Sequence, residues 1–240
     1  IKKFSDEIVL ILTCARTESG NLETDKVFGL ITRPLDWNFI FEQSVYHGIS
    51  PLVYNNLNKI DKKGLIPLEM FYKLKERYDI ALIRNIFLYE ELRFLLDILY
   101  NAGIKAIPIK GVILTELLYF NIGFRETADL DILVSPEDLL LVEKLISQIG
   151  YKKHLTEYSE NYYRLYHYHM PYERTDKYGR QFFCEIHWAL SLPRPNIILF
   201  PDIWKNASMQ KVNDMSVLCL SPEGMFFSLI TQLRRHNRPF

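Results

Sequence analysis

The chain has 240 residues, of which 48% are hydrophobic and 24% charged, and this composition excludes a disordered protein. The 29 Lys and Arg residues balance 29 Asp and Glu residues, so the net charge does not favour binding to nucleic acid or anionic membranes. No apolar run approaches the roughly 18–20 residues that span a bilayer. Three cysteines without a Cys-x-x-Cys pair disfavour a disulfide framework and a thiolate zinc site, and we expect a cytoplasmic location.

The first hundred residues carry helical patterns. Asp36 is a suitable N-cap for a helix that ends at His47-Gly48, and a second short helix is expected after Pro51. The strongest pattern begins at Pro67, where apolar residues recur at spacings of three and four. It predicts one long amphipathic helix, or two nearly continuous ones, with Asn101-Ala102-Gly103 as the stop signal.

After this helix, short strands alternate with helices. Ser135 is the expected N-cap of the middle helix and Gly150 its stop, while Asp176-Lys177-Tyr178-Gly179 predicts a turn between the last two strands. The predicted strands are 104–109, 128–134, 169–174 and 181–190, and the predicted helices are 112–120, 135–149 and one from 221 that continues to Arg234.

These elements predict an α+β protein with three segments. Residues 1–100 form a helical N-terminal region, and residues 101–200 form a core with a mixed β-sheet and flanking helices. Residues 201–240 hold the start of a C-terminal helical region.

Asp129-Leu130-Asp131 is the most informative local feature, because two acids interrupt a buried strand. Side chains two apart on a strand share a face, so the two carboxylates project together. Adjacent buried carboxylates stay ionised only when a cation or hydrogen bonds compensate them, and Mg²⁺ prefers such ligands. The alternative is that both acids lie at a sheet end and are solvated.

Glu185 and His187 form a similar pattern, since they share one face of an otherwise apolar strand. If that strand lies beside Asp129 and Asp131, Glu185 completes a cluster of three acids that can hold two divalent ions. The alternative for Glu185 is an edge-strand acid that faces water. A buried, hydrogen-bonded role for His187 is favoured over a role as a metal ligand.

Lys110-Gly111 follows a strand and opens a helix, a geometry in which backbone N–H groups receive phosphate. It is not a Walker A loop, and an ordinary strand-to-helix turn is the alternative. Arg125 lies four residues before Asp129 and either neutralises a phosphate, braces the acids or is a surface arginine.

Lys110-Gly111, Arg125, Asp129-Leu130-Asp131-Ile132-Leu133-Val134 and Glu185-Ile186-His187-Trp188 occur in this order. Together they resemble the pattern of a bacterial group of uncharacterised nucleotidyltransferases within the polymerase-β-like nucleotidyltransferase superfamily. The segment from Trp37 to Leu52 resembles that group's helical front, and Leu220-Ser221-Pro222-Glu223 resembles the start of its C-terminal helices. The resemblance covers most of the chain and is more specific for the fold than for the substrate.

The resemblance implies a nucleotidyltransferase core at 101–200 and transfer of a nucleoside monophosphate from an NTP, such as ATP, to a hydroxyl acceptor with release of pyrophosphate. Asp129 and Asp131 match the paired metal-binding acids, and Glu185 matches the third acid. Lys110 and Gly111 match the phosphate-binding turn. One or two Mg²⁺ ions are the implied cofactors, and Mn²⁺ is compatible with the same ligands.

Val112 departs from the superfamily pattern, in which Gly-Ser or Gly-Gly occupies the turn, so one hydroxyl contact to the triphosphate is missing. A binding or regulatory module without turnover therefore stays open. A metal-dependent phosphohydrolase is a second alternative, because three acids alone do not distinguish transfer to water from transfer to an alcohol. The acceptor is a small molecule, a protein side chain or an RNA end, and the neutral charge favours the small molecule.

The remaining histidines and tyrosines give weaker signals. His167 and His169 have the spacing of strand metal ligands, but no acid or cysteine nearby in the sequence completes a metal site. His169 leads towards Glu185, and with His187 it is a weak candidate for the acceptor pocket. The tyrosines from Tyr158 to Tyr172 either stack on a base or pack amphipathically. The basic residues Arg234, Arg235, His236 and Arg238 are expected to be a solvated helix end.

Overall fold

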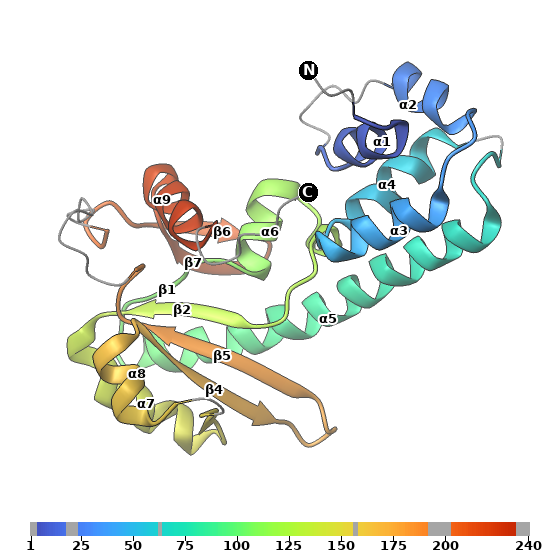
Figure 1. Ribbon diagram of the computed structural model, residues 1–240. Coiled ribbons are helices and arrows are strands. Elements are labelled where there is room, and N and C mark those ends of the chain that lie inside the picture. The colour runs from blue at the N-terminus through green and yellow to red at the C-terminus, as the bar shows by residue number, and fades with distance from the viewer. Residues whose placement is uncertain (1–3, 18–23, 62–63, 156–157, 192–202, 234–240) are drawn as a thin grey trace. The chain divides into compact units, whose positions relative to one another are not determined.

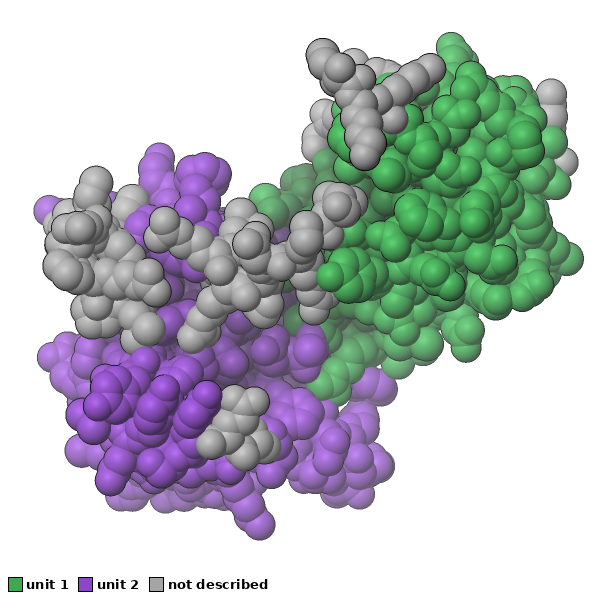
Figure 2. Space-filling view, viewed as in Figure 1, with its two compact units in different colours: residues 1–86, 115–127 green, residues 87–114, 128–240 purple. Residues whose placement is uncertain are grey.

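The computed structural model describes residues 4–17, 24–61, 64–155, 158–191 and 203–233 (Figure 1). The chain is divided into two units, coloured in Figure 2. Unit 1 comprises Ile1–Ile86 and Thr115–Thr127, and unit 2 comprises Phe87–Leu114 and Ala128–Phe240. The predicted α+β class is confirmed. None of the helices in the described ranges has the length and apolar character that crossing a membrane requires.

Unit 1 is helical, as predicted for the start of the chain. Asp36 caps α3, since its carboxylate accepts a hydrogen bond from the Phe39 N–H at 3.0 Å, and Gly48 with φ +66° follows the helix end. A buried apolar cluster that includes Leu10, Ile40, Leu57 and Leu74 forms the core of this unit. The helices are α1 (Asp6–Cys14), α2 (Thr24–Ile31), α3 (Trp37–Tyr46), α4 (Ser50–Ile60) and the first part of α5 (Leu68–Asn101), followed by the 3₁₀ turn η1 (Ile122–Phe124).

Helix α5 is a single helix of 34 residues, which settles the choice between one long helix and two. It ends at the predicted signal: Gly103 has φ +78°, and the Ile104 N–H donates to the Leu99 carbonyl at 3.0 Å. The boundary between the units falls within this helix, after Ile86.

Unit 2 contains a five-stranded mixed sheet in the order β1-β2-β5-β4-β3. Strands β2 and β5 are parallel and the other neighbouring pairs are antiparallel, and β2, β5 and β4 run side by side in Figure 1. The four predicted strands are present, although β5 ends before Leu190. The strands are β1 (Ala106–Pro108), β2 (Leu130–Val134), β3 (Lys152–Lys153), β4 (His169–Thr175) and β5 (Gln181–His187).

The two faces of the sheet differ in chemistry. Alternate residues such as Ile132, Ile186 and Met170 are buried on one face. There the second part of α5 is tied to the sheet, because Glu91 accepts hydrogen bonds from the Tyr151 hydroxyl at 2.7 Å and from Arg174 Nε at 2.9 Å. The opposite face carries the ionisable side chains of the candidate site.

The predicted helix 135–149 has a different start. A 3₁₀ turn, η2 (Pro136–Asp138), precedes α7 (Leu139–Gln148). Ser135 occupies the N-cap position of η2, as predicted, but its side chain makes no capping hydrogen bond. The reason is local, since the Ser135 hydroxyl donates to the Glu137 carboxylate at 2.8 Å instead of accepting a helix N–H. Gly150, with φ +95°, ends the segment as expected.

Several further elements complete the described chain. Helix α6 (Val112–Tyr119) matches its prediction, whereas α8 (Glu160–Tyr166) was not predicted. A hairpin of β6 (Ser208–Val212) and β7 (Met215–Cys219) was also not predicted, and its turn uses Asn213 at φ +53°. Helix α9 (Pro222–Leu233) begins where expected. The predicted basic end, Arg234 to Arg238, lies outside the described residues.

Candidate active site and metal centre

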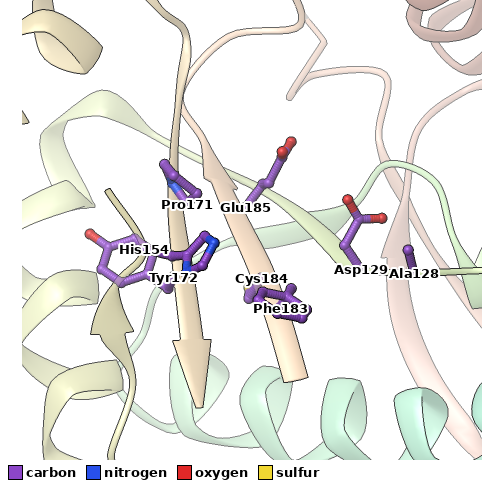
Figure 3. Close-up of a pocket in the computed structure, with 8 residues that line it drawn as sticks. All are labelled: Ala128, Asp129, His154, Pro171, Tyr172, Phe183, Cys184 and Glu185. Atoms are coloured by element: carbon purple, nitrogen blue, oxygen red, sulfur yellow. The ribbon is translucent and has the colours of Figure 1, made fainter. Parts of the chain in front are cut away.

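Asp131 and Glu185 lie directly opposite each other on the parallel strands β2 and β5. Asp129 comes two residues earlier than Asp131 and projects to the same face. One carboxylate oxygen from each of the three residues lies within 4.8 Å of the others. The structure thus brings together the three acids that the sequence singled out. Figure 3 labels Glu185, which lies on β5, and Asp129, which directly precedes β2.

Lys110 follows β1 and supplies a cation to this cluster. Its Nζ lies 2.6 Å from Asp131 Oδ1 and 4.0 Å from Glu185 Oε2. Burial lowers the pKa of Lys110, but the charges of Asp131 and Asp129 outweigh burial, so the net shift is upward and the ammonium is retained. In the structure as it stands, Lys110 therefore neutralises part of the acid cluster.

Gly111 forms the turn between Lys110 and α6. It is buried and has φ +68°, a conformation that favours glycine over residues with a Cβ. Val112 is fully buried at the first position of α6 and has no hydroxyl to offer a phosphate. The turn lies between β1 and α6, as the sequence predicted, and its nucleotide-binding role stays a prediction.

His187 contacts two of the three acids. Its Nε2 lies 2.9 Å from Asp131 Oδ1 and 3.2 Å from Glu185 Oε2, and its side chain is only 2% exposed. Burial lowers the pKa of His187, whereas the hydrogen bonds to Asp131 and Glu185 raise it, and the net shift is upward. The interpretation of His187 as a buried, hydrogen-bonded histidine agrees with these contacts.

His169 is the neighbour of His187 on β4, and the two residues are paired across the β4–β5 ladder. Its Nε2 lies 3.7 Å from Glu185 Oε1. The sequence argument against a metal site at His169 was that no acid lies nearby in the chain. The strand pairing places Glu185 and His187 beside His169, and these three residues form a second group of potential metal ligands. The geometry alone does not test whether His169 binds a metal.

The three carboxylates do not share one electrostatic environment. Burial and then the charge of Asp131 raise the pKa of Asp129 to about 6. For Glu185, burial acts in the same direction, but the His187 hydrogen bond and the charges of His169, His187 and Lys110 outweigh it and lower the pKa. Glu185 is therefore an ionised carboxylate at neutral pH. The pKa of Asp129, at about 6, is much closer to neutral pH.

A divalent ion fits the acid cluster on one further observation. Asp131 Oδ2 is buried and has no hydrogen-bond partner among the residues that the structure describes. A buried acceptor without a partner is costly, and a cation bound by oxygen ligands removes that cost. Asp129, Asp131 and Glu185 offer the hard carboxylate oxygens that Mg²⁺ and Mn²⁺ prefer.

A cavity of about 210 Å³ lies beside the acids (Figure 3). Asp129 and Glu185 line it together with the rings of His154 and Phe183, which are in edge contact with centroids 5.2 Å apart. The other lining residues are Ala128, Pro171, Tyr172 and Cys184. Sequence reasoning missed this cavity. Phe183 lies two residues before Glu185, so the strand pattern predicts that it shares a face with Glu185. His154 is far from β5 in the sequence and lines the cavity only in the folded structure.

Arg125 is the one predicted site residue that does not belong to unit 2. It lies in unit 1, where its carbonyl accepts a hydrogen bond from Asn85 Nδ2 at 2.7 Å. Its expected role in phosphate binding stays a prediction.

Residues 33–239 match the model of a family described as uncharacterised nucleotidyltransferases, and the chain belongs to this family. The resemblance found in the sequence motifs is therefore confirmed. Searches of the curated proteins and of the solved structures gave no significant match.

Proposed function

We propose that the protein is a Mg²⁺-dependent enzyme that transfers a nucleoside monophosphate from an NTP to a hydroxyl acceptor and releases pyrophosphate. The observation that carries this proposal is the group of carboxylate oxygens from Asp129, Asp131 and Glu185 within 4.8 Å of one another. Family membership supports the general reaction class.

The three carboxylates would hold one or two Mg²⁺ ions, which neutralise the triphosphate and lower the pKa of the acceptor hydroxyl when bound. Lys110 and the Gly111 amide would contact the outgoing pyrophosphate. The Lys110 ammonium is already directed at the cluster through Asp131, so a bound phosphate finds it in place.

In the proposed reaction, the acceptor oxygen attacks the α-phosphorus and the bond from that phosphorus to the pyrophosphate oxygen breaks. The hydroxyl proton passes to Glu185, which is ionised before the reaction and lines the cavity proposed for the acceptor. The cavity beside Glu185 would hold the acceptor, with Phe183 and His154 as its aromatic wall. Catalysis would rest on positioning and charge neutralisation.

A small-molecule acceptor and a cytoplasmic, bacterial setting are part of the same proposal. The balanced charge of the chain supports the small molecule over a nucleic acid, and the cavity volume of about 210 Å³ suits a small group. The buried Val112 is the feature that favours the alternative of a module without turnover.

A thermal-shift panel tests donor binding first. ATP, GTP, CTP and UTP are added with and without Mg²⁺ to the wild type, to Asp131→Asn and to Asp97→Asn, an exposed acid on α5 that serves as the control. A nucleotide at 100 times its Kd stabilises the fold by about 2.7 kcal/mol. We expect stabilisation that requires Mg²⁺ and is lost only in Asp131→Asn.

The reaction is then followed with the preferred NTP labelled at the α-phosphate and an extract of small metabolites. Label in a new phosphodiester product, together with pyrophosphate, supports the transferase. Label recovered only as free NMP indicates a phosphohydrolase. Nucleotide binding without turnover indicates the regulatory module, and no binding to any nucleotide contradicts the proposal.

A further inference from the structure

Three side chains beside the acid cluster form a donor set of a different chemical kind. His169, Glu185 and His187 each offer one ligand atom, and these atoms lie within 4.8 Å of one another. The residues come from adjacent positions on β4 and β5, where His169 is paired with His187. Both imidazoles are buried, so the group is held by the sheet and not by a loop.

The nature of the donors determines which ion they prefer. Two imidazole nitrogens and one carboxylate are typical of catalytic Zn²⁺ sites and of other first-row transition metals, whereas Mg²⁺ prefers oxygen ligands only. The acid group Asp129, Asp131 and Glu185 offers oxygen alone. Glu185 is common to both groups, and its two oxygens are directed differently, with Oε1 nearer His169 and Oε2 nearer His187.

We propose that His169, Glu185 and His187 bind one divalent transition-metal ion, Zn²⁺ in the first instance, beside the Mg²⁺ site of the acids. This inference deepens the proposed function, because it makes the centre mixed: one ion on oxygen ligands and a second on a nitrogen-rich subsite. The donor set itself is defined by the strand pairing and does not require that the reaction be the one proposed.

The Nε2 atoms of both histidines are directed towards Glu185. The 3.7 Å separation between His169 Nε2 and Glu185 Oε1 is too long for a hydrogen bond, although the two groups face each other. Within the described residues, His187 Nδ1 makes no hydrogen bond, so the polar contacts of this buried ring all go to the carboxylates. An ion bound between the three side chains would give His169 Nε2 and Glu185 Oε1, which are too far apart for a hydrogen bond, a common partner.

The test uses the untagged full chain, because a polyhistidine tag binds the same ions. The protein is stripped with a chelator and titrated with Co²⁺, a spectroscopic substitute for Zn²⁺, in excess Mg²⁺ and without nucleotide. Zn²⁺ affinity is measured by competition with a chromogenic chelator. We expect one Co²⁺ per chain with a visible ligand-field absorption that Mg²⁺ does not displace.

The variants His169→Gln and His187→Gln remove one ligand each, and His167→Gln is the matched control, since its ring lies 5.5 Å from that of His169 but is not in the group. Loss of a ligand should cost more than the 10- to 100-fold typical of an outer-shell partner, so we expect an affinity loss of about 100-fold or more in the first two variants only. Thermal unfolding of the stripped proteins verifies their folding, and His169→Gln alone decides the question if His187→Gln does not fold.

Unchanged Co²⁺ affinity in His169→Gln, or displacement of Co²⁺ by Mg²⁺, overturns the inference. The proposed function has a separate readout in the Mg²⁺-dependent nucleotide shift. Histidine-dependent Co²⁺ binding without that shift supports the metal subsite and contradicts the nucleotidyltransferase proposal. A Mg²⁺-dependent nucleotide shift without histidine-dependent Co²⁺ binding supports the proposed function and contradicts the metal subsite.

Discussion

Lys110 and His187 meet at a single atom of the buried Asp131 carboxylate. Lys110 Nζ lies 2.6 Å and His187 Nε2 lies 2.9 Å from Oδ1, while Oδ2 has no hydrogen-bond partner in the described part of the chain. Within the described residues, Oδ1 of the carboxylate therefore has two nitrogen partners, whereas the buried Oδ2 has none. This asymmetry leaves Oδ2 as the oxygen at which an ion would add without displacing Lys110 or His187 from Oδ1.

Asp129→Asn should stabilise the metal-free protein at neutral pH. The pKa of Asp129 is raised to about 6 in the folded protein, compared with about 4 in the unfolded chain. Ionisation of Asp129 therefore lowers the free energy of unfolding as the pH rises above about 4, and this loss is complete above pH 6. We expect the variant to gain up to about 3 kcal/mol of unfolding free energy at pH 8 and almost nothing at pH 4. Urea denaturation in chelator at both pH values, with Asp97→Asn as control, measures this. A loss of stability at pH 8 would contradict it.

Lys110→Met should destabilise the metal-free protein more than the metal-loaded one. Removal of the ammonium leaves the buried Asp131 carboxylate with less compensation, a change that costs about 3 kcal/mol for a buried pair. A divalent ion can replace the lost charge, so Mg²⁺ should restore much of the stability. Unfolding curves with chelator and with Mg²⁺ give the comparison, and equal losses in the two conditions would mean that the ion binds elsewhere.

Gly111→Ala and Gly103→Ala separate backbone strain from nucleotide binding. Both glycines have positive φ, +68° and +78° respectively, so each substitution should cost about 1–2 kcal/mol of stability. Only Gly111 lies in the turn assigned to the phosphates. We therefore expect weaker nucleotide binding in Gly111→Ala and normal binding in Gly103→Ala, measured by titration at a temperature where both variants are folded. Equal nucleotide affinities in the two variants would remove the phosphate turn from the proposal.

Arg174→Met should be among the most destabilising substitutions in unit 2. Arg174 forms a bidentate pair with Glu91, whose side chain is 5% exposed, and the variant would leave this carboxylate buried without its cation. We expect a loss of about 3–5 kcal/mol in urea denaturation. Arg33→Met, which breaks an exposed pair with Asp6, should cost no more than about 1 kcal/mol. The double variant Glu91→Leu/Arg174→Met should be more stable than Arg174→Met alone. If the double variant is less stable, the unpaired Glu91 carboxylate is not the cause of the loss in Arg174→Met.

The sequence was sufficient for the features that depend on local pattern. The capping carboxylate of Asp36, the long α5 and the strand that carries Asp131 follow from spacing and from single strong residues. The proximity of Glu185 to Asp131 was a hypothesis about which strands pair, and the parallel register confirms it.

Features that depend on long-range placement could not be read in the same way. As a metal ligand, His169 was disfavoured because no acid or cysteine lies near it in the sequence. Its neighbours in space, Glu185 and His187, come from β5. The β6–β7 hairpin had a readable signal, since Asn213-Asp214 separates two short strands, and it was missed. Ser135 occupies the predicted cap position, but its hydroxyl donates to the Glu137 carboxylate and makes no capping hydrogen bond.

The parallel pairing of β2 with β5 also bears on how the protein folds. Asp131 and His187 are 56 residues apart in the chain, and β5 must pair with β2 before they meet. Such non-local pairing is slow to form, because the entropy of closing the intervening loop is lost first. A chain in which β5 has not yet paired with β2 holds Asp129 and Asp131 without their third acid. Capture of a divalent ion would therefore report that the sheet has closed, and the bound ion would oppose its reopening.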